Sequence, residues 1–469
     1  MKLTSQSRNI IFIYFGDAAS RLLGLAAISY LARILGPSDF GIISIGLAAL
    51  AYVLVIGNSG LKILGTRKVA GEQESIEVLT PRIILTQLLL SAAAFGIGTG
   101  INYFFIDESD IFRVTLVYLL GVFPTAFLLE WFFQGRQKLG IMAAGKIIGM
   151  IFYLGMVLIL VKSSRDLIWV AWAWIIGIGA NSIFLWIVFK AKYYSSSFQK
   201  KQLKIISLLR EALPLGAATI IAQLTTQFPP LYLGLVAGTS QVGLFSAAFK
   251  VIVFLLILDR TFYAIFFPLI SRCFHKFPEK LEENVNLVLR ITTVLVLIVG
   301  LYAVVSGEFI IRGIFGVSFL GAVPIFQVLV GYFIFNVINS VFTFSLIGME
   351  KEKVYTVSLL AGMIAFILFL LLFTEALGTF SVAGGLIIYQ LTALVIMAAA
   401  LKNQIHLNYI RTLLLPLLGT CLLVIPLLLY IHLIFYIKIM FITFIGIPYI
   451  LWLGGIGKNE VYFLKRKFI

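Results

Sequence analysis

The sequence is poor in charged residues. Of its 469 residues only 12% are charged, whereas 61% are hydrophobic, and the mean hydropathy is +1.07. Soluble domains carry roughly 25% charged residues, so a soluble chain of this composition would expose large apolar patches and aggregate. The shortage of charge therefore excludes an ordinary soluble domain and predicts an all-α integral membrane protein.

Cysteine and histidine are also scarce. Two cysteines do not make a disulfide framework, and the three histidines have no metal-ligand spacing. Residues 140–147 nearly spell a phosphate-binding loop, but the final Ser or Thr is missing and the segment lies in a predicted membrane helix. We therefore predict no metal, no cofactor and no catalytic site, and hence no enzyme.

Acidic residues are fewer than basic ones. The chain has 20 Asp and Glu against 36 Lys and Arg, a net charge of +16. A nucleic-acid partner is not predicted, because no basic domain or motif stands apart from the hydrophobic segments. The same excess of Lys and Arg is typical of the cytoplasmic loops of membrane proteins.

Long hydrophobic runs are the dominant feature. A membrane helix needs about 20 mostly apolar residues, and runs of this kind predict about fourteen transmembrane helices. They span residues 10–35, 40–64, 82–106, 111–133, 140–161, 166–189, 213–236, 242–270, 285–306, 322–347, 354–374, 379–401, 409–431 and 433–456. Lys and Arg concentrate at both ends of the chain and in every second loop. This asymmetry predicts that both termini are cytoplasmic.

A segment near the start of the chain recurs in its second half. Gly36-Pro-Ser-Asp-Phe-Gly41 is matched by Gly238-Thr-Ser-Gln-Val-Gly243, and weaker matches follow in the same order. An even number of helices in each copy predicts two parallel six-helix repeats around a central cavity, an arrangement that permits alternating access. The predicted parts are an N-lobe at 1–189, a basic cytoplasmic linker helix at 190–212, a C-lobe at 213–401, and two additional helices with a basic tail at 402–469.

Three segments carry a resemblance to a known family. They are residues 21–41, residues 60–70 and the Glu130-Trp-Phe-Phe-Gln-Gly135 motif. Together they resemble the polysaccharide (O-antigen type) flippases of the multidrug/oligosaccharidyl-lipid/polysaccharide exporter superfamily. One departure is that Asn58-Ser59 stand where the family often has an acidic residue, which weakens any carboxylate role at that point.

The resemblance implies a flippase for undecaprenyl-diphosphate-linked oligosaccharide units in the bacterial inner membrane, serving O-antigen, capsule or exopolysaccharide synthesis. It implies polyprenyl-diphosphate-linked oligosaccharide, a coupling ion (proton or sodium) and membrane lipid as partners, with a polysaccharide polymerase and chain-length proteins as further ones. The alternatives are a multidrug or peptidoglycan-precursor exporter of the same superfamily and, in another class, a membrane polysaccharide polymerase or glycosyltransferase.

Charges embedded in the predicted helices are the candidate site residues, because a charge in the bilayer that persists usually faces a cavity or a partner. The candidate substrate-binding cations are Arg21, Lys62, Lys146, Lys250 and Arg260, which suit a diphosphate. The candidate ion-coupling acids are Asp17, Glu130 and Asp259.

Four of these candidates also have a structural interpretation. Asp17 and Arg21 stand at i,i+4 spacing and can form a structural ion pair. Lys62 is near a helix end, where a lysine can extend its ammonium group to the interface. Glu130 is placed where it can serve as a helix cap or an interfacial ion pair.

Overall fold

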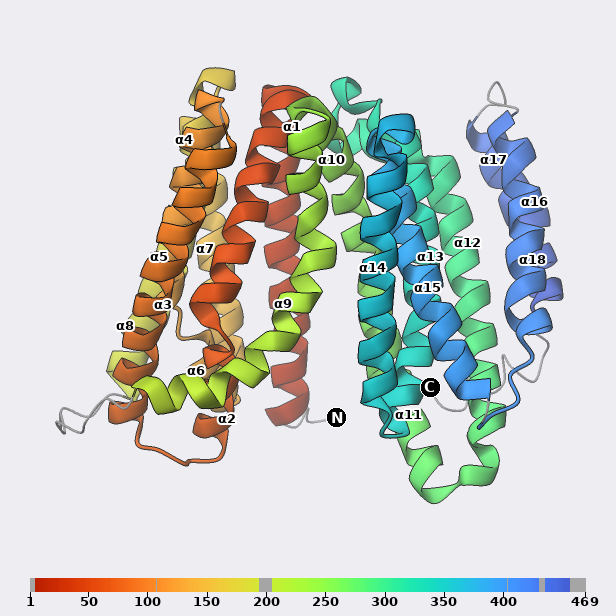
Figure 1. Ribbon diagram of the computed structural model, residues 1–469, viewed down its shortest axis with the longest axis horizontal. Coiled ribbons are helices and arrows are strands. Elements are labelled where there is room, and N and C mark those ends of the chain that lie inside the picture. The colour runs from red at the N-terminus through yellow and green to blue at the C-terminus, as the bar shows by residue number, and fades with distance from the viewer. Residues whose placement is uncertain (1–4, 107, 194–204, 403, 430–434, 456–469) are drawn as a thin grey trace. The chain divides into compact units, whose positions relative to one another are not determined.

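The computed structural model describes residues 5–106, 108–193, 205–402, 404–429 and 435–455. Throughout these ranges the regular structure is helical, as the hydrophobic pattern predicts. The chain divides into two compact units, residues 1–243 and 244–469. Figure 1 shows the helices of each unit.

The first unit contains the helices up to the start of α10. They are α1 (Ser5–Asn58), α2 (Leu61–Ala70), α3 (Ile76–Phe105), α4 (Ser109–Leu120), α5 (Val122–Ala126), α6 (Glu130–Gly135), α7 (Leu139–Leu160), the 3-10 turn η1 (Ser164–Asp166), α8 (Leu167–Lys192), α9 (Ile205–Val236) and α10 (Thr239–Leu255). The long helix α1 contacts α3, α4, α7, α8 and α9, so it is the element around which this unit is built.

The second unit begins within α10. Its helices are α11 (Ile257–Lys276), η2 (Pro278–Lys280), α12 (Leu281–Phe315), η3 (Val317–Phe319), α13 (Ala322–Gly348), α14 (Glu352–Leu377), α15 (Thr379–Lys402), η4 (Ile410–Leu414), α16 (Leu415–Leu429), α17 (Phe435–Phe441), η5 (Ile442–Gly446) and α18 (Ile447–Leu453). Helix α13 contacts α11, α12, α14 and α15. The last helices pack on α12 through a buried cluster that includes Leu297, Leu427 and Ile450.

Ten helices in the described ranges are long and apolar enough to cross a membrane, and two shorter apolar helices, Ile410–Val424 and Ile437–Leu453, follow them. The first of the ten, Ala19–Asn58, contains a break, because Gly36 has φ 73° and ψ 179°. A non-glycine residue would be strained there, and Pro37 follows it. The element therefore holds two of the predicted helices, and the observed set agrees with about fourteen.

The second predicted helix, 40–64, is interrupted in the structure. It ends at Asn58, and α2 begins at Leu61 after Ser59 (φ 42°) and Gly60 (φ 82°). The fourth, 111–133, is likewise divided into α4, α5 and α6. Hydropathy averaged over about 20 residues does not locate these breaks, because the first comprises only a few polar residues around Ser59 and the second, at 127–129, is apolar.

Helix α9 joins the basic stretch to the second half of the chain. Figure 1 shows its first turns lying crosswise to the other helices of the first unit before it bends. Pro214 lies inside α9, and an internal proline removes a helix hydrogen bond and permits a bend. The first turns of α9 fall in the predicted linker (190–212) of the sequence-based division, and residues 194–204 lie outside the described residues.

Candidate functional site

The first unit brings three of the predicted charged residues into electrostatic contact. Lys62 lies in the first turn of α2, Glu130 begins α6, and Lys146 lies on α7. Glu130 and Lys146 both act on the Lys62 ammonium, the first attracting and the second repelling it. All three side chains are half-buried, where such interactions are less screened than at a surface. This cluster is named the lysine–glutamate cluster.

Local structure explains how Lys62 is positioned. The Lys62 backbone N–H donates to Asn58 Oδ1 at 3.0 Å, and Gln87 Nε2 donates to the same oxygen at 3.3 Å. Asn58 thus caps α2 across the Ser59–Gly60 break. Asn58-Ser59 are the residues that depart from the family pattern, which often has an acidic residue here. In the structure the amide of Asn58 has a capping role.

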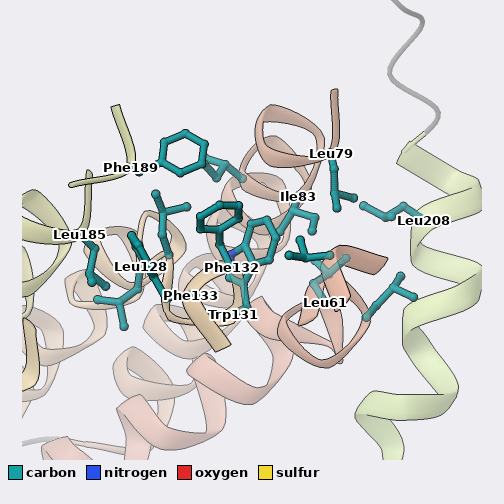
Figure 2. Packing of buried hydrophobic residues seen from close by; sticks show 14 of the residues in the cluster. Leu61, Leu79, Ile83, Leu128, Trp131, Phe132, Phe133, Leu185, Phe189 and Leu208 are labelled. Carbon is teal, nitrogen blue, oxygen red and sulfur yellow. The ribbon is translucent and has the colours of Figure 1, made fainter. Parts of the chain in front are cut away.

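Glu130 is held by an aromatic core. The residues that follow it, Trp131, Phe132 and Phe133, are fully buried with leucines and isoleucines of neighbouring helices, as Figure 2 shows. The Phe132 ring makes edge-to-face contacts with Phe189 at 4.9 Å between centroids and with Phe133 at 5.2 Å. The Glu130 carboxylate is in the first turn of α6, the end of a helix that favours negative charge.

An uncharged residue completes this cluster. Asn181 on α8 is 4% exposed, and its Nδ2 donates to Glu130 Oε1 at 3.5 Å. Asn181 was not among the residues predicted from the sequence, because a single amide in an apolar helix carries no charge signal. Its occurrence in the middle of a predicted membrane segment was the signal that could have found it.

The other predicted residues of the first unit lie on α1. Arg21 is half-buried. The side chain of Asp17 lies outside the described residues, so the Asp17–Arg21 pair stays a prediction.

The second unit holds Lys250 on α10 and both Asp259 and Arg260 on α11. Ser340 Oγ on α13 donates a hydrogen bond to Asp259 Oδ1. The carboxylate of Asp259 also acts electrostatically on the phenols of Tyr332 and Tyr355. Asp259 is therefore the acidic centre of a polar group on α11, α13 and α14, whereas the side chain of Arg260 lies outside the described residues.

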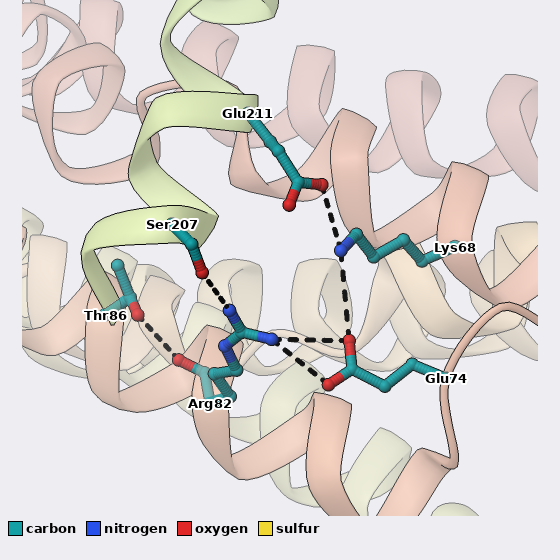
Figure 3. A network of polar contacts seen from close by, with 6 residues as sticks. All are labelled: Lys68, Glu74, Arg82, Thr86, Ser207 and Glu211. Carbon is teal, nitrogen blue, oxygen red and sulfur yellow. Dashed lines mark hydrogen bonds and ion pairs between the residues drawn. The ribbon is translucent and has the colours of Figure 1, made fainter. Parts of the chain in front are cut away.

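A second polar network fastens the start of α9 to α2 and α3 of the same unit (Figure 3). Lys68 Nζ on α2 is 2.9 Å from Glu211 Oε2 on α9 and 3.9 Å from Glu74 Oε2. Arg82 on α3 pairs with Glu74 at 3.1 Å and donates to Ser207 Oγ at 2.8 Å. The pattern of Lys and Arg in the loops predicts no more than a cytoplasmic position for Lys68 and Arg82. Their pairing with α9 is a tertiary feature that spacing does not reveal.

The two copies of the repeated segment touch. A Cβ atom added to Gly41 would overlap the carbonyl oxygen of Thr239, and one added to Gly243 would overlap the carbonyl oxygen of Pro37. Ser38 Oγ and Thr239 Oγ1 share a hydrogen bond of 2.8 Å. The matched segments thus pack backbone to backbone through reciprocal contacts.

In the described ranges no group of three or more His, Cys, Asp or Glu side chains is arranged to hold a metal ion. The lysine–glutamate cluster offers ammonium groups and one carboxylate. Such a set can bind an anion and exchange a proton.

Comparison with known proteins gives matches at both the sequence and the fold level. The model of the family described as "Polysaccharide biosynthesis protein" matches residues 7–274, more than half of the chain. Two proteins named "Putative O-antigen transporter" match over 250 residues, one from Shigella dysenteriae at 26% identity and one from Escherichia coli (strain K12) at 22%. These matches cover 52% of this chain and 62% and 60% of the relatives, so the chain is aligned with less than two thirds of their length.

Solved structures with the same fold include a flippase and a multidrug transporter. The lipid II flippase MurJ in an inward closed conformation has a TM-score of 0.75 at 16% identity, and the match covers 96% of this chain and 100% of that one. An inward-facing multidrug resistance MATE family transporter of the MOP superfamily has a TM-score of 0.62 at 15% identity, with 82% and 96% covered. These relatives and neighbours are named as transporters or flippases, in agreement with the prediction that the chain is not an enzyme.

Proposed function

Since the chain belongs to the polysaccharide biosynthesis protein family, we propose that it is a flippase for undecaprenyl-diphosphate-linked oligosaccharide repeat units. It moves them across the bacterial inner membrane, with both termini cytoplasmic, by ion-coupled alternating access. The observation that carries this proposal is the lysine–glutamate cluster. Two lysines and one glutamate from three helices interact electrostatically beside a large apolar core.

The cluster suits a diphosphate because of its charge balance. Lys62 and Lys146 repel each other, and the Glu130 carboxylate offsets part of that repulsion. At an effective dielectric constant near 20, two unit charges about 4 Å apart interact by about 4 kcal/mol. A diphosphate that approached both ammonium groups would gain attraction from each, and Arg21 on α1 would add a guanidinium that can bind a phosphate with two hydrogen bonds.

The second unit supplies a separate set of candidate groups. Lys250 and Arg260 are proposed as further substrate-binding cations, and Asp259 as a coupling acid together with Asp17 and Glu130. Ser340 supports the role of Asp259, because a hydroxyl can donate to an ionised carboxylate and accept from a protonated one. The coupling ion is a proton or sodium.

Alternating access requires that one side of the protein be closed while the other is open. We assign the closure on the outer side to the contact between the repeated segments, because the 36–41 turn is predicted to be external. A Ser38→Cys/Thr239→Cys pair, in a chain with Cys273 and Cys421 replaced by Ser, should cross-link under oxidation and stop transport until a reductant is added. Unimpaired transport by the cross-linked protein would contradict alternating access through this contact.

The substrate proposal is tested with purified protein in sealed vesicles that contain a fluorescent undecaprenyl-diphosphate-linked sugar. Lys62→Met and Lys146→Met should each reduce flipping at least about tenfold, because the loss of one charged contact with phosphate corresponds to about 1.5–3 kcal/mol. Lys138→Met removes an exposed lysine and should leave the rate unchanged. Wild-type rates in both cluster variants, with equal protein in the membrane, would remove the support for an anion site here.

A further inference from the structure

The two polar groups of the Asn181 amide differ in their hydrogen bonding within the described residues. Its Nδ2 donates to Glu130 Oε1 at 3.5 Å, a long hydrogen bond. Its Oδ1 is buried and has no hydrogen-bond partner among the residues that the structure describes. A buried acceptor without a donor is costly and calls for a physical reason. A physical reason for the unbonded Oδ1 is the Glu130 carboxylate, to which the Nδ2 of the same amide donates.

The two ends of an amide are nearly the same in shape, so a half-turn about χ2 exchanges a donor for an acceptor. In the observed orientation the amide donates to an ionised Glu130. After a half-turn, Oδ1 would face the carboxyl group and accept a hydrogen bond from a protonated Glu130. Asn181 can therefore donate to an ionised Glu130 and accept from the O–H of a protonated one, whereas a fixed donor would leave that O–H without an acceptor.

The backbone of α7 leaves room for this amide. A Cβ atom on Gly145 would overlap Asn181 Oδ1, and a Cβ on Gly149 would lie 3.1 Å from Asn181 Cβ. The amide thus lies directly against α7 at a point where two glycines allow close approach. Lys146, which acts on Lys62, is the residue next to Gly145, so the amide and the lysine–glutamate cluster share one part of α7.

Charge balance connects the proton with the anion. An ionised Glu130 attracts Lys62 and so competes with any anion for that ammonium group. A protonated Glu130 leaves Lys62 and Lys146 without this compensation. The groups that face this centre are Lys62 from α2, Lys146 from α7 and the uncharged Asn181 from α8. Proton uptake therefore favours anion binding, and by linkage anion binding favours proton uptake to the same extent.

We propose that Asn181 is the positioning residue of a proton-coupling site at Glu130, and that its amide turns over when Glu130 gains or loses a proton. This inference rests on the proposed function, because it assigns the coupling ion as a proton and places the coupling at the substrate-binding cations. In the ionised state Glu130 holds Lys62, and in the neutral state Lys62 is released to the diphosphate of the substrate.

The test measures Glu130 directly and needs no substrate. Full-length protein in lipid nanodiscs is examined by infrared difference spectroscopy between pH values, and the carboxylic-acid C=O band that disappears in Glu130→Gln is assigned to Glu130. In Asn181→Leu the ionised carboxylate loses its donor. Hydrogen bonds to charged groups are about twice as strong as neutral ones, so the midpoint of the band should move up by about one pH unit. The band should also change frequency, because the neutral acid loses its acceptor.

Two glycine variants on α7 provide a matched pair in which Asn181 itself is not mutated. Gly145→Ala displaces the amide and should shift the midpoint in the same direction as Asn181→Leu. Gly155→Ala adds the same methyl group where nothing lies within 4 Å, and should leave the midpoint unchanged. If Asn181→Leu and Gly145→Ala lower thermal stability but do not move the midpoint, Asn181 is only a packing residue and the inference is wrong. Absence of any titrating band that depends on Glu130 would overturn it as well.

A separate experiment tests the proposed substrate independently of the role of Asn181. Undecaprenyl diphosphate added to the wild-type nanodiscs should raise the Glu130 midpoint, because anion and proton bind together. If the variants shift the midpoint but undecaprenyl diphosphate does not, the coupling role of Asn181 stands and the proposed substrate fails. If undecaprenyl diphosphate shifts the midpoint but the variants do not, the substrate stands and the role of Asn181 fails.

Discussion

Gly41 and Gly243 lie against each other's segments: the carbonyl group of Thr239 covers the α-carbon of Gly41, and the carbonyl group of Pro37 covers that of Gly243. Neither position has space for a methyl group. A close approach of two backbones is a physical reason for glycine that is independent of its φ angle. Because the two glycines occupy matching places in the repeat, one contact explains both.

Gly41→Ala or Gly243→Ala should force the two segments apart. Overpacking costs about 1–3 kcal/mol, and about 1 kcal/mol already changes an equilibrium roughly fivefold. We therefore expect the yield of the Ser38→Cys/Thr239→Cys cross-link to fall at least about fivefold in either variant. Gly155→Ala, at a site with open space, is the control and should keep the full yield. An undiminished cross-link in the Gly41→Ala protein would show that the segments do not pack as described.

Two arginine–glutamate pairs of similar length differ in burial. Arg82–Glu74, at 3.1 Å, has side chains that are 10% and 22% exposed, whereas Arg136–Glu72, at 3.2 Å, has side chains that are 35% and 76% exposed. Breaking a buried pair leaves an uncompensated charge and costs about 3–5 kcal/mol, and an exposed pair is worth about 0–1 kcal/mol. In thermal unfolding in detergent, Arg82→Leu should lower the midpoint clearly and Arg136→Leu hardly at all. Equal losses would mean that burial does not set the strength of these pairs.

The aromatic core beside Glu130 gives a packing prediction. Phe132 is 0% exposed and Phe104 is 79% exposed. Phe132→Ala should destabilise the protein by about 3–5 kcal/mol through the cavity that it leaves. The value should fall at the low end of that range, since lipid is as apolar as the core and only packing is lost. Phe104→Ala should change stability by less than about 0.5 kcal/mol, as measured by resistance to unfolding in mixed micelles. A larger loss from Phe104→Ala than from Phe132→Ala would contradict the assignment of the core.

The orientation can be measured with single cysteines in a chain without its native ones. A cysteine at the N-terminus and one between Lys190 and Arg210 should react with a membrane-impermeant maleimide only after the cells are opened. A cysteine at Ser109 should react in intact cells. The reverse pattern at Ser109 and the 190–210 stretch would overturn the predicted orientation and, with it, the outer position of the repeated segments.

How far the sequence predicts the site depends on the physical signal that each residue carries. Lys62, Glu130 and Lys146 are recognisable because charge is rare in apolar helices. Their mutual proximity is not recognisable, because it arises from the packing of α2, α6 and α7, which are distant in the chain. Asn181 carries neither charge nor a repeating spacing. Its polar amide in a predicted membrane segment is the one sequence signal, and its contact with Glu130 shows which residue it serves.

The fold, too, has features that the sequence predicts and features that depend on tertiary contacts. The break at Gly36 is predictable, because glycine followed by proline ends a helix. The interruption at Ser59–Gly60 is shorter than the window over which hydropathy is averaged, and it depends on the capping of α2 by Asn58. The fastening of the first turns of α9 through Arg82 and Lys68 was not predictable either, since its partners, Ser207 and Glu211, look like ordinary polar positions of a basic linker.

The reciprocal glycine contact has an evolutionary consequence. If the two matching halves arose by duplication of one shorter gene, the ancestral product had a single copy of this segment. Contacts that are now reciprocal within one chain correspond to an isologous interface, in which the same patch meets itself across a twofold axis. The glycine at position 41 would then have faced its own copy in a second subunit. The ancestor of this chain would have worked as a homodimer of half-length subunits, and the linker before α9 would be the piece that fused them.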